Sequence, residues 1–107
     1  MKSEALYAVI SAASLGDNTL VAAVAGKKIR VLSAVLVASG GVNTVRFESD
    51  ASGSALTGQM DLADGGQLSL PLNGYGWFET VLGELLNLEL GAAAAVAGCI
   101  VYQLVED

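Results

Sequence analysis

The sequence predicts an all-β protein, an antiparallel β-sandwich or barrel of about eight or nine short strands. Three observations lead to this prediction. Turn signals recur at regular intervals, apolar and polar residues alternate with a period of two between them, and the length of 107 residues suits one domain. Residues 1–107 are therefore expected to form a single β-sandwich domain.

The turn signals are groups of Gly, Asn and Asp, which adopt positive φ or bond to their own backbone. They fall near residues 15–18, 25–27, 39–41, 50–53, 64–66, 73–74, 83 and 98. Such spacings of about 8–12 residues are typical of sandwiches and barrels. The strands predicted between them are 5–11, 19–24, 28–39, 43–49, 56–62, 67–70, 77–81, 85–90 and 99–105.

Two of these strands are apolar on both faces. A strict period of two from 29 to 37 predicts one face with Ile29, Val31, Val35 and Val37, and an opposite face with Leu32, Ala34 and Leu36. The run 99–105 shows the same pattern. One face would meet the sandwich core and the other a partner chain.

The segment 84–97 has a helical alternative. Its leucines and alanines favour a helix, but Leu86, Leu88 and Leu90 alternate with Asn87 and Glu89, which fits a strand better. We therefore expect a strand followed by an alanine-rich loop.

The composition predicts contacts with other protein chains. Hydrophobic residues make up 53% of the chain and charged residues 15%, whereas a typical domain has about 25% charged residues. A small domain has much surface for its volume, so the apolar excess indicates subunit interfaces. The net charge of −6 and the lack of a basic cluster exclude phosphate-driven binding of nucleic acid.

We expect no enzyme activity, cofactor or metal. The chain has no His, which removes the commonest general base and metal ligand. Cys99 is the only cysteine and lies in an apolar run, which predicts a buried, inert thiol. The carboxylate pairs Asp61/Asp64 and Glu79/Glu84 are interpreted as solvated loop residues; calcium at 61–66 is an alternative that the spacing does not favour.

Membrane insertion and secretion are not expected either. The longest uncharged apolar stretch, 90–102, is shorter than the roughly 20 residues of a spanning helix. At the start of the chain, Lys2 is soon followed by Glu4, and the apolar patch after them is too short for a secretory signal.

The aromatic cluster Tyr75, Trp77 and Phe78 has three interpretations. It could close one end of the core, anchor a subunit interface, or form a platform on which a sugar stacks. The core is the first choice, and a sugar ligand is the least expected.

The N-terminal residues 1–11 have two interpretations. They form either an extended arm that adds to a neighbouring chain or simply the first strand of the sandwich. Taken together, the candidate interface residues are Met1, Lys2, Leu6, Tyr7, Leu32, Leu36, Tyr75, Trp77, Phe78 and Tyr102.

Five segments in order resemble small structural proteins of tailed bacteriophages. They are residues 10–19 (ISAASLGDNT), 24–31 (VAGKKIRV), 58–62 (GQMDL), 74–80 (GYGWFET) and 83–88 (GELLNL). The resemblance is to capsid decoration, or cement, proteins, and it implies a jelly-roll-like antiparallel β-sandwich. It implies a homotrimer that binds the major capsid protein on the exterior of the virion, after synthesis in the host cytoplasm.

Two other functions remain as alternatives. One is a different virion module in the tail, collar or fibre base. The other is a carbohydrate-binding module for attachment to the host.

Overall fold

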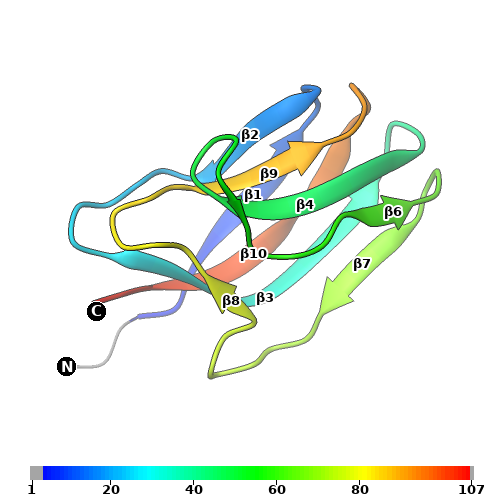
Figure 1. Ribbon diagram of the computed structural model, residues 1–107. Coiled ribbons are helices and arrows are strands. Elements are labelled where there is room, and N and C mark those ends of the chain that lie inside the picture. The colour runs from blue at the N-terminus through cyan, green and yellow to red at the C-terminus, as the bar shows by residue number, and fades with distance from the viewer. Residues whose placement is uncertain (1–3, 107) are drawn as a thin grey trace.

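The architecture is a sandwich of two antiparallel sheets (Figure 1). The computed structural model describes residues 4–106, and every regular element in that range is a strand. Sheet A has the order β1-β10-β3-β7, with β8 also paired to β3, and sheet B has the order β2-β9-β4-β5, with β6 also paired to β4. The strands are β1 (Leu6–Ala12), β2 (Gly16–Val21), β3 (Lys28–Ala38), β4 (Asn43–Ser49), β5 (Ser54–Ala55), β6 (Met60–Leu62), β7 (Gln67–Leu70), β8 (Phe78–Glu79), β9 (Leu86–Leu90) and β10 (Val96–Val105). The predicted all-β sandwich is confirmed.

The strand order results from a nested pairing of the two halves of the chain. β1 pairs with β10, β2 with β9, β3 with β7 and β8, and β4 with β5 and β6, all antiparallel. This nested pairing makes the whole chain one long antiparallel hairpin. Because the hairpin is folded around the core, successive strand pairs belong alternately to sheet A and to sheet B. This arrangement is jelly-roll-like, as the resemblance implied.

Most predicted strands are present, with shifts at their ends. The strands predicted at 43–49 and 67–70 are β4 and β7 without change. Of the strand predicted at 56–62 only Met60–Leu62 is a strand, β6, and the short β5 precedes the predicted range, which raises the number of strands in residues 4–106 to ten. β2 begins earlier than expected, at Gly16, and β10 begins at Val96 rather than at 99. The helical alternative for 84–97 is wrong, because this segment contains β9 and the start of β10.

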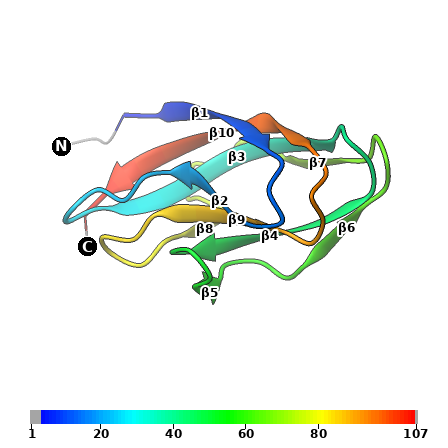
Figure 2. The same ribbon diagram turned by 90° about the horizontal axis from the view of Figure 1, so that it is seen from above.

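The core lies between the two sheets, which form separate layers when the molecule is seen from above (Figure 2). Both sheets contribute to it, for example through Ile10, Leu36 and Ile100 from sheet A and Phe47 and Leu88 from sheet B. The ring of Phe47 packs against Phe78 of β8 with a centroid distance of 4.9 Å.

A β-bulge in β3 corrects the predicted division of that strand into two faces. Val101 of β10 is opposite Ser33, whereas Tyr102 is opposite Val31, so Leu32 is the extra residue. The bulge shifts the alternation by one residue. As a result, Ile29 and Val31 share the core face with Ala34, Leu36 and Ala38. The prediction from strict alternation, which placed Ile29 and Val31 on the face opposite Ala34 and Leu36, is therefore wrong.

The N-terminal segment is the edge strand of sheet A over the residues that are described. Leu6–Ala12 pair with β10 along their whole length, and the side chains of Ile10 and Ala12 are buried. Over these residues the segment is the first strand of the sandwich, with one edge left unpaired within the chain. Met1 and Lys2 lie outside the described residues.

Candidate functional site

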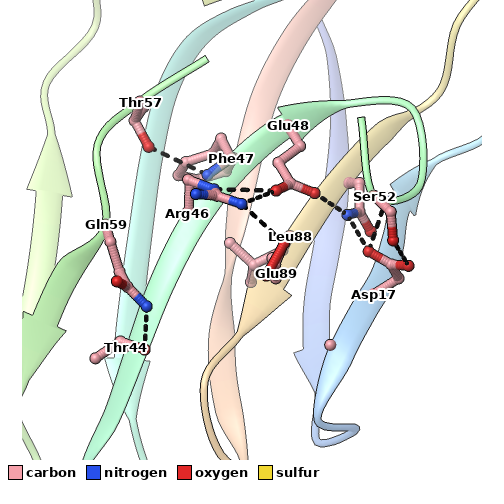
Figure 3. Close-up of polar contacts among 12 residues, drawn as sticks. Asp17, Thr44, Arg46, Phe47, Glu48, Ser52, Thr57, Gln59, Leu88 and Glu89 are labelled. Carbon is pink, nitrogen blue, oxygen red and sulfur yellow. Dashed lines mark hydrogen bonds and ion pairs between the residues drawn. The ribbon is translucent and has the colours of Figure 1, made fainter. Parts of the chain in front are cut away.

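The outer face of sheet B carries a polar network that spans three strands (Figure 3). Asp17 of β2 and Arg46 of β4 are both opposite Glu89 of β9, and Glu48 is opposite Asn87. The side-chain nitrogen of Asn87 donates to Asp17 Oδ1 at 2.8 Å and to Glu48 Oε1 at 2.9 Å. Arg46 Nη2 lies 2.5 Å from Glu48 Oε2 and 3.1 Å from Glu89 Oε2.

The turn after β4 bonds to Asp17, and Glu48 in the same network is a buried carboxylate. Asp50 and Ser52 in this turn have positive φ angles of 73° and 53°. The Ser52 hydroxyl donates to Asp17 Oδ2 at 2.7 Å, and its backbone N–H donates to Asp17 Oδ1 at 3.0 Å. The side chain of Glu48 is only 1% exposed.

The contacts move the carboxyl pKa values in opposite directions. Hydrogen bonds from Ser52 and Asn87 lower the pKa of Asp17. Burial raises the pKa of Glu48, but the contacts with Glu89, Arg46 and Asn87 outweigh burial, and the net shift is downward. The pKa of Glu89 is raised, first by its hydrogen bond to Glu48.

These shifts determine how the network contributes to stability at different pH. A lowered pKa in the folded state means that Asp17 and Glu48 stabilise the fold above the ordinary carboxyl pKa of about 4. That contribution is lost as the pH falls through their folded-state values. Glu89 has the opposite sign: its stabilising contribution is present at low pH and is lost as the pH rises through its raised pKa.

The same three carboxylates are a geometric candidate for a metal site. Asp17, Glu48 and Glu89 offer oxygens within 4.8 Å of one another. However, Asn87 already donates to Asp17 and Glu48, and Arg46 pairs with Glu48 and Glu89. A cation would have to displace this guanidinium. We therefore assign the network a structural role: it connects β2, β9 and β4.

The outer face of sheet A is different. Its charged side chains Lys28, Arg30 and Glu79 form ion pairs at the end of the sheet where β8 pairs with β3, and the rest of the face is apolar and uncharged. Strand register arranges its side chains in three rows across the sheet: Tyr7, Val101 and Ser33; Val9, Cys99, Val35 and Ser69; and Ser11, Ala97, Val37 and Gln67. We call these rows the apolar face. None of its residues carries a charge, and Tyr7 and Val9 are 76% and 70% exposed. A solvated sheet face normally alternates to polar residues, so this face is the better candidate for a contact with other molecules.

A hollow of about 550 Å³ lies beside the apolar face, next to β7. Its lining includes Val35, Leu70, Pro71, Leu72 and Cys99. The thiol of Cys99 is exposed there, so the prediction of a buried thiol is wrong. The surrounding sequence is apolar on both sides of the strand, and periodicity therefore could not show that residue 99 points outward.

The aromatic cluster is divided between the core and the surface. Phe78 packs against the core, as the favoured interpretation predicted. Tyr75 is 93% exposed and Trp77 is 43% exposed, so neither closes the core. The indole N–H of Trp77 donates to the carbonyl oxygen of Pro71 at 2.7 Å, which places this ring next to the hollow.

The other candidate interface residues are scattered. Tyr7 lies on the apolar face, whereas Leu6 and Tyr102 are half-buried partners in the β1–β10 ladder. Leu32 and Leu36 are 4% and 0% exposed. A partner of the folded domain cannot contact these two side chains, and we drop them from the interface. Sequence reasoning missed Val9 and Cys99, because their outward orientation follows from the register with β10.

Comparisons with known proteins identified no relative of this chain. No protein family model matches the chain, and neither curated proteins nor solved structures include a significant match. No helix in residues 4–106 is long and apolar enough to span a membrane.

Proposed function

We propose that the chain is a structural virion protein, a capsid decoration protein that assembles as a trimer through its apolar face and bridges major capsid subunits. The observation that carries the proposal is the contrast between the outer face of sheet B and the apolar face of sheet A. Sheet B is covered by ionic and hydrogen-bonded side chains, whereas the rows around Val9, Cys99 and Val35 expose apolar side chains without a single charge.

The physical logic is burial of surface between subunits. Each Å² of apolar surface removed from water contributes about 25 cal/mol, and the apolar face includes no charge that would have to be desolvated. The net charge of −6 lies elsewhere on the chain, and it keeps a domain with an exposed apolar face soluble before it assembles. A protein that binds the assembled lattice and not its free subunits stabilises the lattice by mass action.

Replacing Val35 by lysine is expected to abolish the trimer. Val35 lies in the middle of the apolar face, between Cys99 and Ser69, so burial of the contact would desolvate the new ammonium group. That cost of a few kcal/mol weakens association by about a hundredfold or more. Sedimentation equilibrium at micromolar concentration should show that the mass falls to one third.

The matched control is Thr19→Lys, which adds the same charge on the outer face of sheet B, where Thr19 is exposed. This variant should keep the mass of the unmodified chain, and both variants should melt within a few degrees of it. If Val35→Lys sediments like the unmodified chain, the apolar face is not the trimer contact.

The position in the virion is tested separately. An antibody against the chain, used for immunogold electron microscopy of virus particles from lysates of the host that carries this gene, should label the capsid exterior. Label confined to tails, collars or fibre bases would replace the decoration function with another virion module. Particles without label would overturn the virion function altogether.

One observation favours a second function, the binding of carbohydrate. Tyr75 and Trp77 are exposed aromatic rings of the kind on which sugars stack, and Trp77 bonds to Pro71 at the edge of the hollow. Against it, the polar side chains that line the hollow are Ser33 and Ser69 only, with no carboxylate or amide to bind sugar hydroxyls.

Trp77→Ala distinguishes the two functions. Because the ring is only partly buried, we expect a loss of about 1–2 kcal/mol of folding stability and no change in binding to a glycan array, since the unmodified chain should not bind. Glycan binding that disappears in Trp77→Ala but persists in the core variant Phe78→Leu would favour the carbohydrate module.

A further inference from the structure

The free edge of β1 lacks the features that normally keep a sheet edge from pairing with another chain. Edge strands are usually protected by charges, proline, bulges or shortness. β1 has seven residues, Leu6–Ala12, with no charged residue, glycine or proline among them. Its ladder with β10 runs through seven consecutive pairs without a bulge.

The other edge strands in residues 4–106 are protected. β2 carries Asp17 and has a register shift between Thr19 and Val21. β7 has four residues and is followed at once by Pro71. β5, β6 and β8 have two or three residues each. Among these edge strands, β1 is therefore the one best suited to pair with a strand of another chain.

The alternation of main-chain hydrogen bonds along the strands shows which β1 residues direct their N–H and C=O groups away from β10, toward the free edge. Ala38 of β3 donates its N–H at 2.9 Å to the carbonyl of the residue before β7. Neighbouring residues of an antiparallel strand bond to alternate sides, so Val35 bonds to β10 and its partner Cys99 bonds to β3. Val9, which is opposite Cys99, is then left with its N–H and C=O directed to the free edge. Tyr7 and Ser11 share this orientation.

We propose that β1 pairs antiparallel with β1 of a second copy of the chain, about a two-fold axis at Val9. The pairing would join two A sheets into one continuous sheet. It goes beyond the proposed function, because it uses the edge of sheet A and not its outer face. A two-fold contact combines with a three-fold one, so the two proposals are compatible.

A second copy fits this edge because β1 is complementary to itself. Symmetry about Val9 places Tyr7 opposite Ser11, Leu6 opposite Ala12, and Ile10 opposite Ala8, so that each of these three pairs joins a large side chain and a small one. Tyr7, Val9 and Ser11 stay on the outer face of both copies, and Ala8 and Ile10 stay on the core side, as a continuous sheet requires.

The absence of charge on β1 allows a second copy to bind at this edge. Each copy has a net charge of −6, so a two-fold contact that placed acidic strands together would be repulsive. β2 would bring Asp17 into such a contact, whereas β1 has no charge to oppose.

Val9→Pro tests the pairing. Proline removes an outward N–H, and this position is one where an edge strand tolerates it. In sedimentation equilibrium at micromolar concentration, the unmodified chain should have a mass of an even number of copies, and Val9→Pro should have half of that mass. Val9→Ala is the matched control: it trims the same side chain but keeps the N–H, so it should retain the even number of copies.

Amide hydrogen exchange gives a second measurement that needs no variant. The N–H groups of Tyr7, Val9 and Ser11 should exchange slowly at high protein concentration and faster on dilution, whereas Ala8 should stay protected throughout. An odd number of copies, such as a monomer or trimer, or fast exchange at these three amides at all concentrations, would overturn the pairing. The apolar-face trimer is judged separately by Val35→Lys, which leaves the main chain of β1 intact.

Discussion

Gly98→Ala is expected to prevent the domain from folding at room temperature. Gly98 is in β10, the strand that is paired on both sides in sheet A, and its φ is 157°. A methyl group added there would lie 1.8 Å from the backbone carbonyl oxygen of Val35. A backbone atom held in a ladder cannot turn aside as a flexible side chain can.

The expected cost is about 4 kcal/mol or more, a large part of the roughly 5–15 kcal/mol that stabilises a typical domain. Thermal unfolding followed by circular dichroism measures it. Gly58→Ala is the matched control, because a methyl group at Gly58 meets no atom within 4 Å, and its melting temperature should stay within about 2 °C. A Gly98→Ala variant that melts like the unmodified chain would mean that the β10–β3 contact is looser than the structure shows.

The fold class could be predicted because local signals and tertiary structure agree in most strands. Phe47 alternates with Arg46 and Glu48, and Leu88 alternates with Asn87 and Glu89, and in each case the apolar residue is the one in the core. The nested pairing of strands is not encoded in any such local pattern. It depends on contacts between residues far apart in the chain.

The bulge at Leu32 and the exposure of Cys99 could not be predicted from the sequence. On a strand that is apolar on both faces, a one-residue slip leaves the pattern of apolar residues unchanged, so the sequence contains no mark of the bulge. For the same reason the apolar face could be expected on β3 and β10, but its members could not be assigned. The outward orientation of Val9 and Cys99 was missed, and Leu32 and Leu36, which were expected at an interface, are buried.

The polar network was missed for a different reason. Asp17, Glu48 and Glu89 are far apart in the sequence, and each one alone resembles a solvated carboxylate. Only the register of β2, β9 and β4 brings them together around Asn87. Residue type and spacing along the chain carry no signal for such a cluster.

Phe47→Ala is expected to lower the free energy of unfolding by about 3–5 kcal/mol, the range for removing a fully buried phenylalanine. Phe47 is 0% exposed and is the largest fully buried side chain in the described part of the chain. Its ring is the contact between sheet B and Phe78, which β8 attaches to β3 of sheet A. The loss therefore weakens the packing between the sheets, and it leaves the edge of β1 and the apolar face untouched.

Urea unfolding followed by tryptophan fluorescence measures this loss at the concentration where the chain is monomeric. Phe47→Leu is the control: it keeps most of the apolar volume, so it should cost clearly less than Phe47→Ala. An equal loss in both variants would show that the aromatic contact with Phe78, and not the filling of the core, dominates at this position. A loss below about 1 kcal/mol in Phe47→Ala would contradict the packing of the two sheets around this ring. The substitution leaves a void where the ring was, and this void cannot close unless β4 or β8 moves.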